Sequence, residues 1–163
     1  MREWRVPVTT QEPVKTRGRV IPVRNIYRYM APPTTLELPV PVGTNWRIVN
    51  VLVRYLQFGA NNQYMTFNLE TSMPDASGNV IFGDGISIPN QGSGGVYHGV
   101  WTVGGGVFYQ TVTIAAVNHY LYHYALPDVW LEGGSVLELA FFNVNANDNV
   151  NVWIAYEEEN VLG

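Results

Sequence analysis

The amino-acid sequence predicts an all-β protein: a single jelly-roll-like β-sandwich or related barrel that carries an extended N-terminal arm. At 163 residues the chain has the size of one domain with one core. Aromatic residues make up 13% of the chain and β-branched residues are abundant, which favours strands over helices. Short apolar runs separated by turn residues recur at fairly regular intervals, as in sandwiches and barrels, and no amphipathic helix of convincing length occurs.

Residues 1–30 are expected to form the arm and residues 31–163 the sandwich. Pro7, Pro13 and Pro22 punctuate the first segment. Proline excludes helix and restricts the residue before it, so the arm should be extended and able to add to a sheet edge or run along a groove. The alternative is that residues 19–29 form the first strand of the sandwich and the earlier residues are only a solvated tail.

The candidate strands of the body cover residues 34–41, 46–58, 64–71, 80–86, 96–103, 107–115, 119–125, 135–143 and 149–157, and about eight of these are expected to form. Alternation in the last two predicts the core-facing residues Leu137, Leu139, Phe141, Val150, Val152, Ile154 and Tyr156. Trp153 falls on the opposite face, which implies a partner or a covering arm. Gly104 to Gly106 is expected to be a hairpin tip.

Basic residues gather at the N-terminus. Residues 1–28 hold seven of the nine Lys and Arg side chains, whereas from Tyr55 to Gly163 there are ten acidic residues and no Lys or Arg. A basic arm on an acidic body can lie back on its own domain, reach an adjacent subunit or bind an outside polyanion. Nucleic-acid binding is not expected, because Pro and Val dilute the charges and the acidic body repels phosphates. The residues predicted to dock the arm are Arg2, Arg5, Lys15, Arg17, Arg19, Arg24 and Arg28.

Residues that could carry chemistry are few. There is no cysteine, and of the three histidines His119 and His123 lie on one strand face about 13 Å apart, too far to share a metal ion. Carboxylates have no Lys or Arg after Arg54 to orient them for acid–base work, and no phosphate-binding loop or nucleophile elbow occurs. We therefore expect no catalytic residue, metal or cofactor, and predict that the protein is not an enzyme.

Tyrosines form a stripe in a region without charges. Tyr120, Tyr122 and Tyr124 alternate onto one strand face, where they could stack on carbohydrate or contact another subunit. From Gly85 to Pro127 there is no Asp, Glu, Lys or Arg, and charge depletion is typical of interface cores. The same region never reaches about 20 consecutive apolar residues, so no membrane span is expected. The residues predicted to form the subunit interface are Tyr97, Trp101, Tyr109, Tyr120, Tyr122, Tyr124 and Trp153.

Two segments carry a resemblance to a known group of proteins. Residues 42–51, Val-Gly-Thr-Asn-Trp-Arg-Ile-Val-Asn-Val, and the run from Leu126-Pro127 through Glu132-Gly133-Gly134 to Tyr156-Glu157-Glu158 resemble small β-sandwich structural proteins of tailed bacteriophages. In those proteins a strand opening with Gly-x-x-Trp and a closing strand ending in Tyr-Glu flank a jelly roll or related barrel.

The resemblance implies a capsid decoration (cement) protein. Such a subunit is made in the host cytoplasm, belongs to the virion, is usually a trimer, and stabilises the particle by self-association and by docking its arm onto the major capsid protein or another particle subunit. A neck, tail or head-fibre component of the same particle stays open. The tyrosine stripe keeps open the alternative of a carbohydrate-binding or receptor-binding β-sandwich module.

Overall fold

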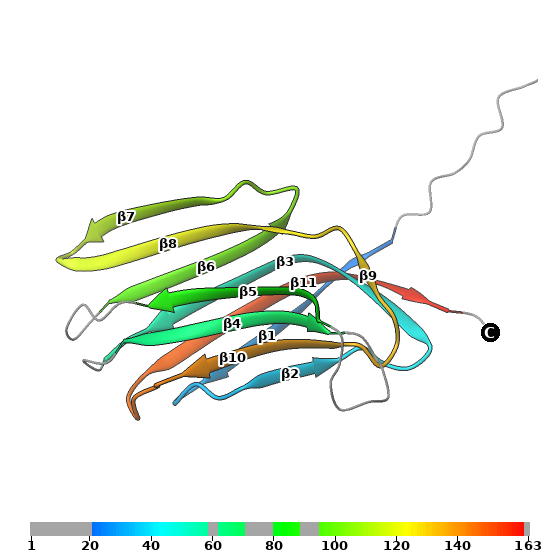
Figure 1. Ribbon diagram of the computed structural model, residues 1–163, viewed down its shortest axis with the longest axis horizontal. Coiled ribbons are helices and arrows are strands. Elements are labelled where there is room, and N and C mark those ends of the chain that lie inside the picture. The colour runs from blue at the N-terminus through cyan, green and yellow to red at the C-terminus, as the bar shows by residue number, and fades with distance from the viewer. Residues whose placement is uncertain (1–20, 59–61, 71–79, 89–94, 162–163) are drawn as a thin grey trace, which may run out of the picture.

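A computed structural model describes residues 21–58, 62–70, 80–88 and 95–161, and these residues form an all-β sandwich (Figure 1). The strands are β1 (Val23–Met30), β2 (Leu36–Pro39), β3 (Thr44–Leu56), β4 (Gln63–Glu70), β5 (Val80–Ile88), β6 (Val96–Val103), β7 (Phe108–Ile114), β8 (Val117–Leu126), β9 (Trp130–Leu131), β10 (Val136–Phe142) and β11 (Asn149–Asn160). Every strand expected from the sequence is present, and the expectation of a single all-β sandwich is confirmed.

The strand order is that of a jelly roll with an insertion. The large sheet runs β1-β11-β3-β6-β8-β7, with β9 also paired to β3, and the small sheet runs β2-β10-β4-β5. The antiparallel pairs β1·β11, β2·β10, β3·β6 and β4·β5 are those of one long ribbon folded over on itself, which is how a jelly roll is wound. Strands β7, β8 and β9 lie between β6 and β10 in the chain and are additions to that ribbon.

The inserted hairpin β7–β8, residues 108–126, extends the large sheet beyond β6, and we call it the wing. β8 pairs in parallel with β6, with Val96 opposite His119, and a parallel neighbour requires a crossover connection, which β7 supplies. The hairpin turn is at Ala115 and Ala116, whose φ angles are 49° and 63°. The expectation that Gly104 to Gly106 forms a hairpin tip is therefore wrong, because β6 and β7 are not paired with each other.

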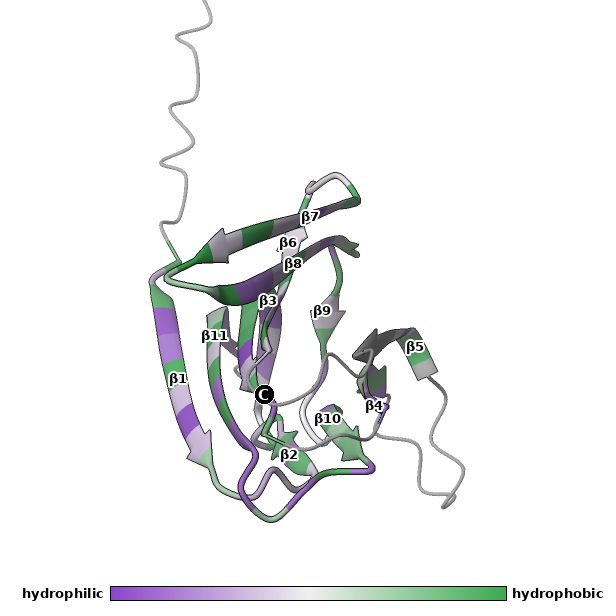
Figure 2. Cartoon of the chain, turned by 90° about the vertical axis from the view of Figure 1, so that its left-hand side faces the viewer, coloured by the Kyte–Doolittle hydropathy of each residue, from purple (hydrophilic) through white to green (hydrophobic). Residues whose placement is uncertain are grey.

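Alternating apolar residues of both sheets fill the core. Leu137 and Leu139 of β10 and Val150 and Val152 of β11 are fully buried, and Ile154 is almost so, as the alternation predicted. Each such side chain contributes about 1.5–3 kcal/mol to folding on burial. Figure 2 shows the green and purple stripes of the strands that surround this core.

The N-terminal boundary of the sandwich lies earlier than expected. Residues 23–30 form β1, and the whole of β1 pairs with β11, from Val23 opposite Glu157 to Met30 opposite Val150. Arg24 and Arg28 thus belong to an edge strand and not to a separate arm. The alternative, a first strand formed by residues 19–29, agrees with the structure over residues 23–29. The remaining arm residues, 1–20, lie outside the described residues.

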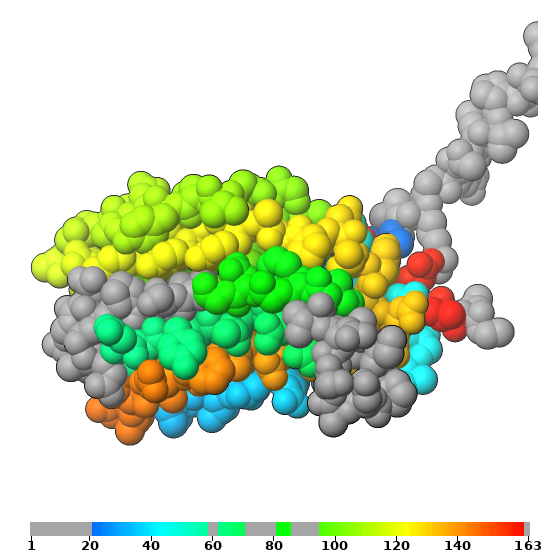
Figure 3. All heavy atoms as spheres, viewed as in Figure 1, coloured from blue at the N-terminus to red at the C-terminus, as the bar shows by residue number. Residues whose placement is uncertain are grey.

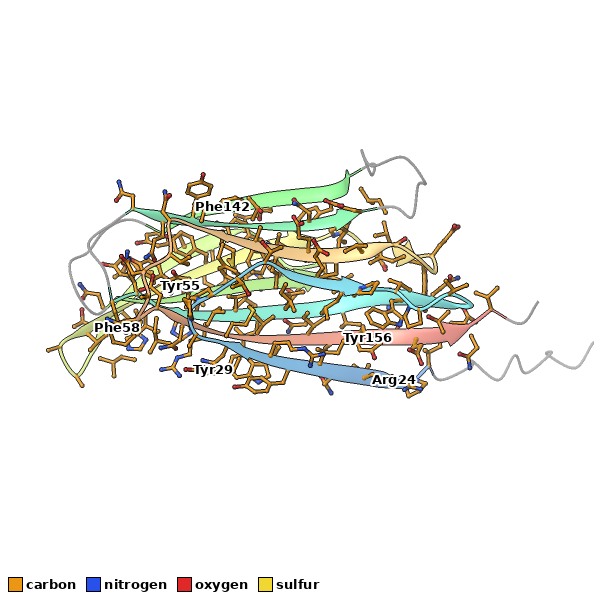
Figure 4. All side chains as sticks on the ribbon, turned by 90° about the horizontal axis from the view of Figure 1, so that it is seen from below. Arg24, Tyr29, Tyr55, Phe58, Phe142 and Tyr156 are labelled. Carbon is orange, nitrogen blue, oxygen red and sulfur yellow. The ribbon has the colours of Figure 1, made fainter. Side chains whose placement is uncertain are left out.

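A buried carboxylate holds one end of the sandwich together. Asp148, fully buried just before β11, accepts hydrogen bonds from the Tyr55 hydroxyl (2.8 Å), the Phe58 backbone N–H (2.7 Å), the Asn145 backbone N–H (2.7 Å) and the Gln63 side-chain amide. Figure 4 shows Tyr55 and Phe58 at this end and Arg24 and Tyr156 toward the other. A buried charge is tolerated only when it is well hydrogen-bonded, so Asp148 is a structural residue.

Candidate functional site

The wing exposes a whole strand that is rich in apolar residues. β7 is the last strand of the large sheet, and all seven of its residues are exposed, among them Tyr109 at 56% and Ile114 at 55%. In Figure 2 green residues alternate with paler ones along β7, and in the space-filling view of Figure 3 the yellow-green and yellow wing forms one side of the molecule. Charged residues are absent from the whole of β7 and β8. A surface of this kind is typical of a contact region.

Aromatic rings run in a continuous series from the core to the wing edge. On the inner face Trp101 stacks on Tyr124 at a centroid distance of 5.6 Å, and Tyr124 lies 6.4 Å from Tyr122. Tyr122 in turn lies 4.8 Å from Tyr109 on β7. Burial, and then the neighbouring Tyr109, raise the pKa of Tyr122 to about 12, so its hydroxyl stays protonated and neutral. We call this series the inner ladder.

The predicted interface residues fall into two groups. Tyr97, Trp101 and Tyr120 are 3%, 0% and 5% exposed and belong to the core of their own chain, so a partner cannot reach them and their assignment to a subunit interface is corrected. They face inward because β6 and the first half of β8 are still covered within the sandwich. Tyr109 is exposed, and Tyr122 and Tyr124 are half-buried, so these three remain within reach of a partner.

Trp153, the seventh predicted interface residue, lies on the outer face of the large sheet and is 39% exposed. Tyr27 of β1 stands directly opposite it, and the two ring centroids are 5.2 Å apart. Part of the indole is therefore covered by a strand that the sequence analysis had placed in the arm.

The ring packing bears on the carbohydrate alternative. A sugar stacks on an open aromatic face. In the inner ladder, however, each ring has another ring against it, and the same holds for Tyr120, which stacks on Tyr97 at 4.8 Å. Only Tyr109 stands at the end of the ladder, where no further described strand lies beyond it.

Histidines line the outer face of the wing and its border with β6. His98 Nε2 and His119 Nδ1 are 3.2 Å apart, and the two rings stack at 5.5 Å. Burial, followed by the proximity of His119 and Arg54, lowers the pKa of His98 and so favours its neutral form. This pair was not predicted, because His119 and His123 share one strand whereas His98 comes from β6.

His123 fixes the connection between β6 and the wing. Its Nδ1 bonds to the Gly106 carbonyl oxygen, which can only accept, so Nδ1 carries the proton. Its Nε2 then accepts from the Thr102 hydroxyl at 3.0 Å. Phe108 stacks on the same ring at 5.0 Å and ends the outer-face series of rings at the wing edge. Among the described residues, no group of three or more His, Asp or Glu side chains is arranged to hold a metal ion.

Arg24, one of the two described basic residues of the predicted arm, lies beside acidic residues at the C-terminal end of β11. Arg24 pairs with Glu158 at 3.1 Å. Arg47 holds Asp128 with two nitrogens and Glu157 at 2.9 Å, and this guanidinium lowers the pKa of Asp128. The other predicted docking residues, Arg2, Arg5, Lys15, Arg17 and Arg19, lie outside the described residues.

Comparisons with known proteins do not assign the chain to a family. No protein-family model and no curated protein matches the chain. Among the residues that the structure describes, no helix is long and apolar enough to cross a membrane.

Proposed function

We propose that this protein is a non-enzymatic structural subunit that associates with copies of itself and joins a larger protein particle as a capsid decoration subunit of a tailed bacteriophage. The observation that carries the proposal is the wing: a hairpin inserted into a jelly roll, without a single charged residue, whose outermost strand is exposed along its whole length. A surface of this composition is favoured in the core of a contact and disfavoured in water.

Two further features support the same proposal. The jelly roll is an architecture that viral capsid domains use, although lectins and cupins share it, so the fold alone does not decide between them. The basic residues 1–20 precede an acidic body, which suits an arm that binds a neighbouring subunit of the particle. The capsid as the particle rests on the sequence resemblance to phage structural proteins.

The experiment measures cosedimentation of the protein with capsids of its source phage that were assembled without it. Full-length protein is expected to cosediment with them to a fixed stoichiometry, and a variant with Arg2, Arg5, Lys15, Arg17 and Arg19 all changed to Gln is expected to bind at least tenfold more weakly. The matched control is R24Q, because Arg24 is engaged with Glu158 on its own domain. Equal binding of the five-site variant would refute arm docking, and no saturable binding by the wild type would refute the decoration function.

The alternative of a carbohydrate-binding module predicts the opposite pattern. Saturable binding to a glycan array, lost in Y109A, together with a monomeric protein that ignores capsids, would replace the structural proposal. The ladder packing described above disfavours it, because every ring of the inner ladder lies against another ring and only Tyr109 lies on the edge strand.

A further inference from the structure

The four sheet edges of the sandwich differ in how they are protected from pairing with another chain. β1 carries Arg24 and Arg28, β2 is four residues long and ends in Pro39, and β5 has Asp84 between two glycines. Charges, short length, proline and glycine are the usual means of blocking an exposed edge. β7, with the sequence Phe-Tyr-Gln-Thr-Val-Thr-Ile, has none of them and is rich in residues that favour strands. Its edge is therefore the one that is ready to pair.

The seven residues of β7 can pair with themselves. In an antiparallel arrangement centred on Thr111, Phe108 lies opposite Ile114 of a second copy, and the whole strand is in register. This register keeps the outer-face residues together, since Phe108 and Ile114 share one face of the strand. Both are about half exposed in the single chain, at 48% and 55%. An aromatic ring opposite a β-branched side chain is a favourable cross-strand pair.

Charge also favours a second copy. A two-fold axis brings each residue close to its own duplicate, so any charged residue near the axis would meet a like charge. No Asp, Glu, Lys or Arg occurs from Gly85 to Pro127, which includes all of β7 and β8. The β7 edge is thus electrostatically compatible with itself, whereas the edge formed by β1 is not.

Both series of rings stop at this edge. The inner ladder ends on Tyr109, and the outer-face stack of His123 with Phe108 ends on Phe108, so the two terminal rings are neighbours on the edge strand. A paired strand would cover both. In the register above, Tyr109 meets Thr113 of the second copy on the inner face.

The N-terminal segment of the chain is a poorer occupant. Its longest run without proline before β1 is residues 14–21, and that run contains Lys15, Arg17 and Arg19. Proline interrupts a hydrogen-bond ladder, and three cations would lose hydration against the uncharged wing. The wing therefore suits an identical wing better than the arm.

We infer that β7 pairs antiparallel with β7 of a second copy about a two-fold axis at Thr111, so that the two large sheets join into one continuous sheet. This inference rests on the proposed self-association and specifies its surface. A two-fold contact alone makes a dimer, so the trimer favoured by the phage resemblance would need a different surface.

A single cysteine tests the register, because the chain has none of its own. Residues directly opposite each other on antiparallel strands have Cα atoms about 4.5–5.5 Å apart, within disulfide range. Full-length T111C is expected to form a covalent dimer under mild oxidation. T113C is the matched control. It makes the same substitution on the same face of the same exposed strand, but in this register residue 113 of the second copy lies about 13 Å away along the strand. Equal cross-linking of both variants, or none of T111C, would overturn the pairing.

Light scattering separates this inference from the proposed function. Wild-type protein is expected to have twice the 18.3 kDa mass of one chain, and V112K, which places a lysine on the edge strand, is expected to be a folded monomer with unchanged circular dichroism. A wild-type trimer whose mass V112K leaves unchanged would refute β7 pairing and leave the decoration proposal intact. A wild-type monomer that also fails to bind capsids would refute both.

Discussion

Replacing the buried Asp148 by Asn is expected to destabilise the protein strongly. Both oxygens of the carboxylate accept hydrogen bonds. Oδ1 accepts from Phe58 N–H, and Oδ2 accepts from Tyr55, Gln63, the Asn145 N–H and, at 3.4 Å, the Asn145 side-chain amide. An asparagine keeps the shape but turns one oxygen into an N–H₂ group. In either orientation that group points at a donor.

The magnitude follows from the bonds lost. A hydrogen bond to a charged group contributes about 1.5–3 kcal/mol, and the bonds that D148N retains become neutral and weaker. We expect D148N to lower the free energy of unfolding by about 3 kcal/mol and Tm by about 6–12 °C. D148A, which takes the acceptor away from all of these donors, should cost about 4 kcal/mol or more.

Urea unfolding followed by tryptophan fluorescence measures the effect, with D128N as the control. Asp128 is also hydrogen-bonded, to Arg47, but it lies on the surface with its side chain 59% exposed, so D128N should shift the urea midpoint little. A D148N midpoint as close to wild type as that of D128N would refute the reasoning that the carboxylate holds this end of the sandwich together.

Two further predictions concern the attachment of the wing and the histidine pair. A β-carbon at Gly105 would collide with the Thr102 hydroxyl and lie 2.6 Å from the His123 ring, so G105A should lower Tm by several degrees. G106A is the control, because a β-carbon at Gly106 meets open space and should leave Tm unchanged. Equal Tm values for the two variants would contradict the anchoring role of His123. Because the folded pKa of His98 lies below its ordinary 6.5, protons bind the unfolded chain first as the pH falls, and stability is lost from about pH 6.5 down to the lowered pKa. Thermal melts from pH 8 to pH 5 should show this loss in wild type and a smaller one in H98Q, and identical profiles would exclude His98 as its source.

The sequence could predict the strands because each strand is a local pattern. Alternation gave the core face of β10 and β11, and the turn residues gave strand ends that match the structure closely, with Val96–Val103 identical. β1 was only the alternative to an arm, because Arg24 and Arg28 interrupt the apolar face that they share with Ile26 and Met30, and because Pro22 precedes the strand. Its pairing with β11, at least 120 residues away in the chain, is what makes it a strand.

The parts that the sequence could not predict are non-local contacts. Asp148 has the appearance of an ordinary turn residue, and its donors Tyr55 and Gln63 lie 93 and 85 residues earlier in the chain. Likewise, His98 meets His119 only because β8 pairs in parallel with β6. Periodicity assigns a residue to a face of its own strand, but the choice of neighbouring strand depends on how the whole chain is wound.

The position of the wing within the jelly roll supports the proposal that it serves contact with another chain. The ribbon strands already pair with one another and bury the core, and β8 adds Tyr120 and Leu126 to it. β7, by contrast, buries none of its seven side chains, so the stability of the single chain gives no reason for an uncharged, strand-favouring sequence there. An exposed strand that served only as the crossover between β6 and β8 could carry lysine or glutamate at no cost to the core. The absence of charge at this edge is accounted for if another strand covers it, and the T111C and V112K experiments ask whether that strand is β7 of a second copy.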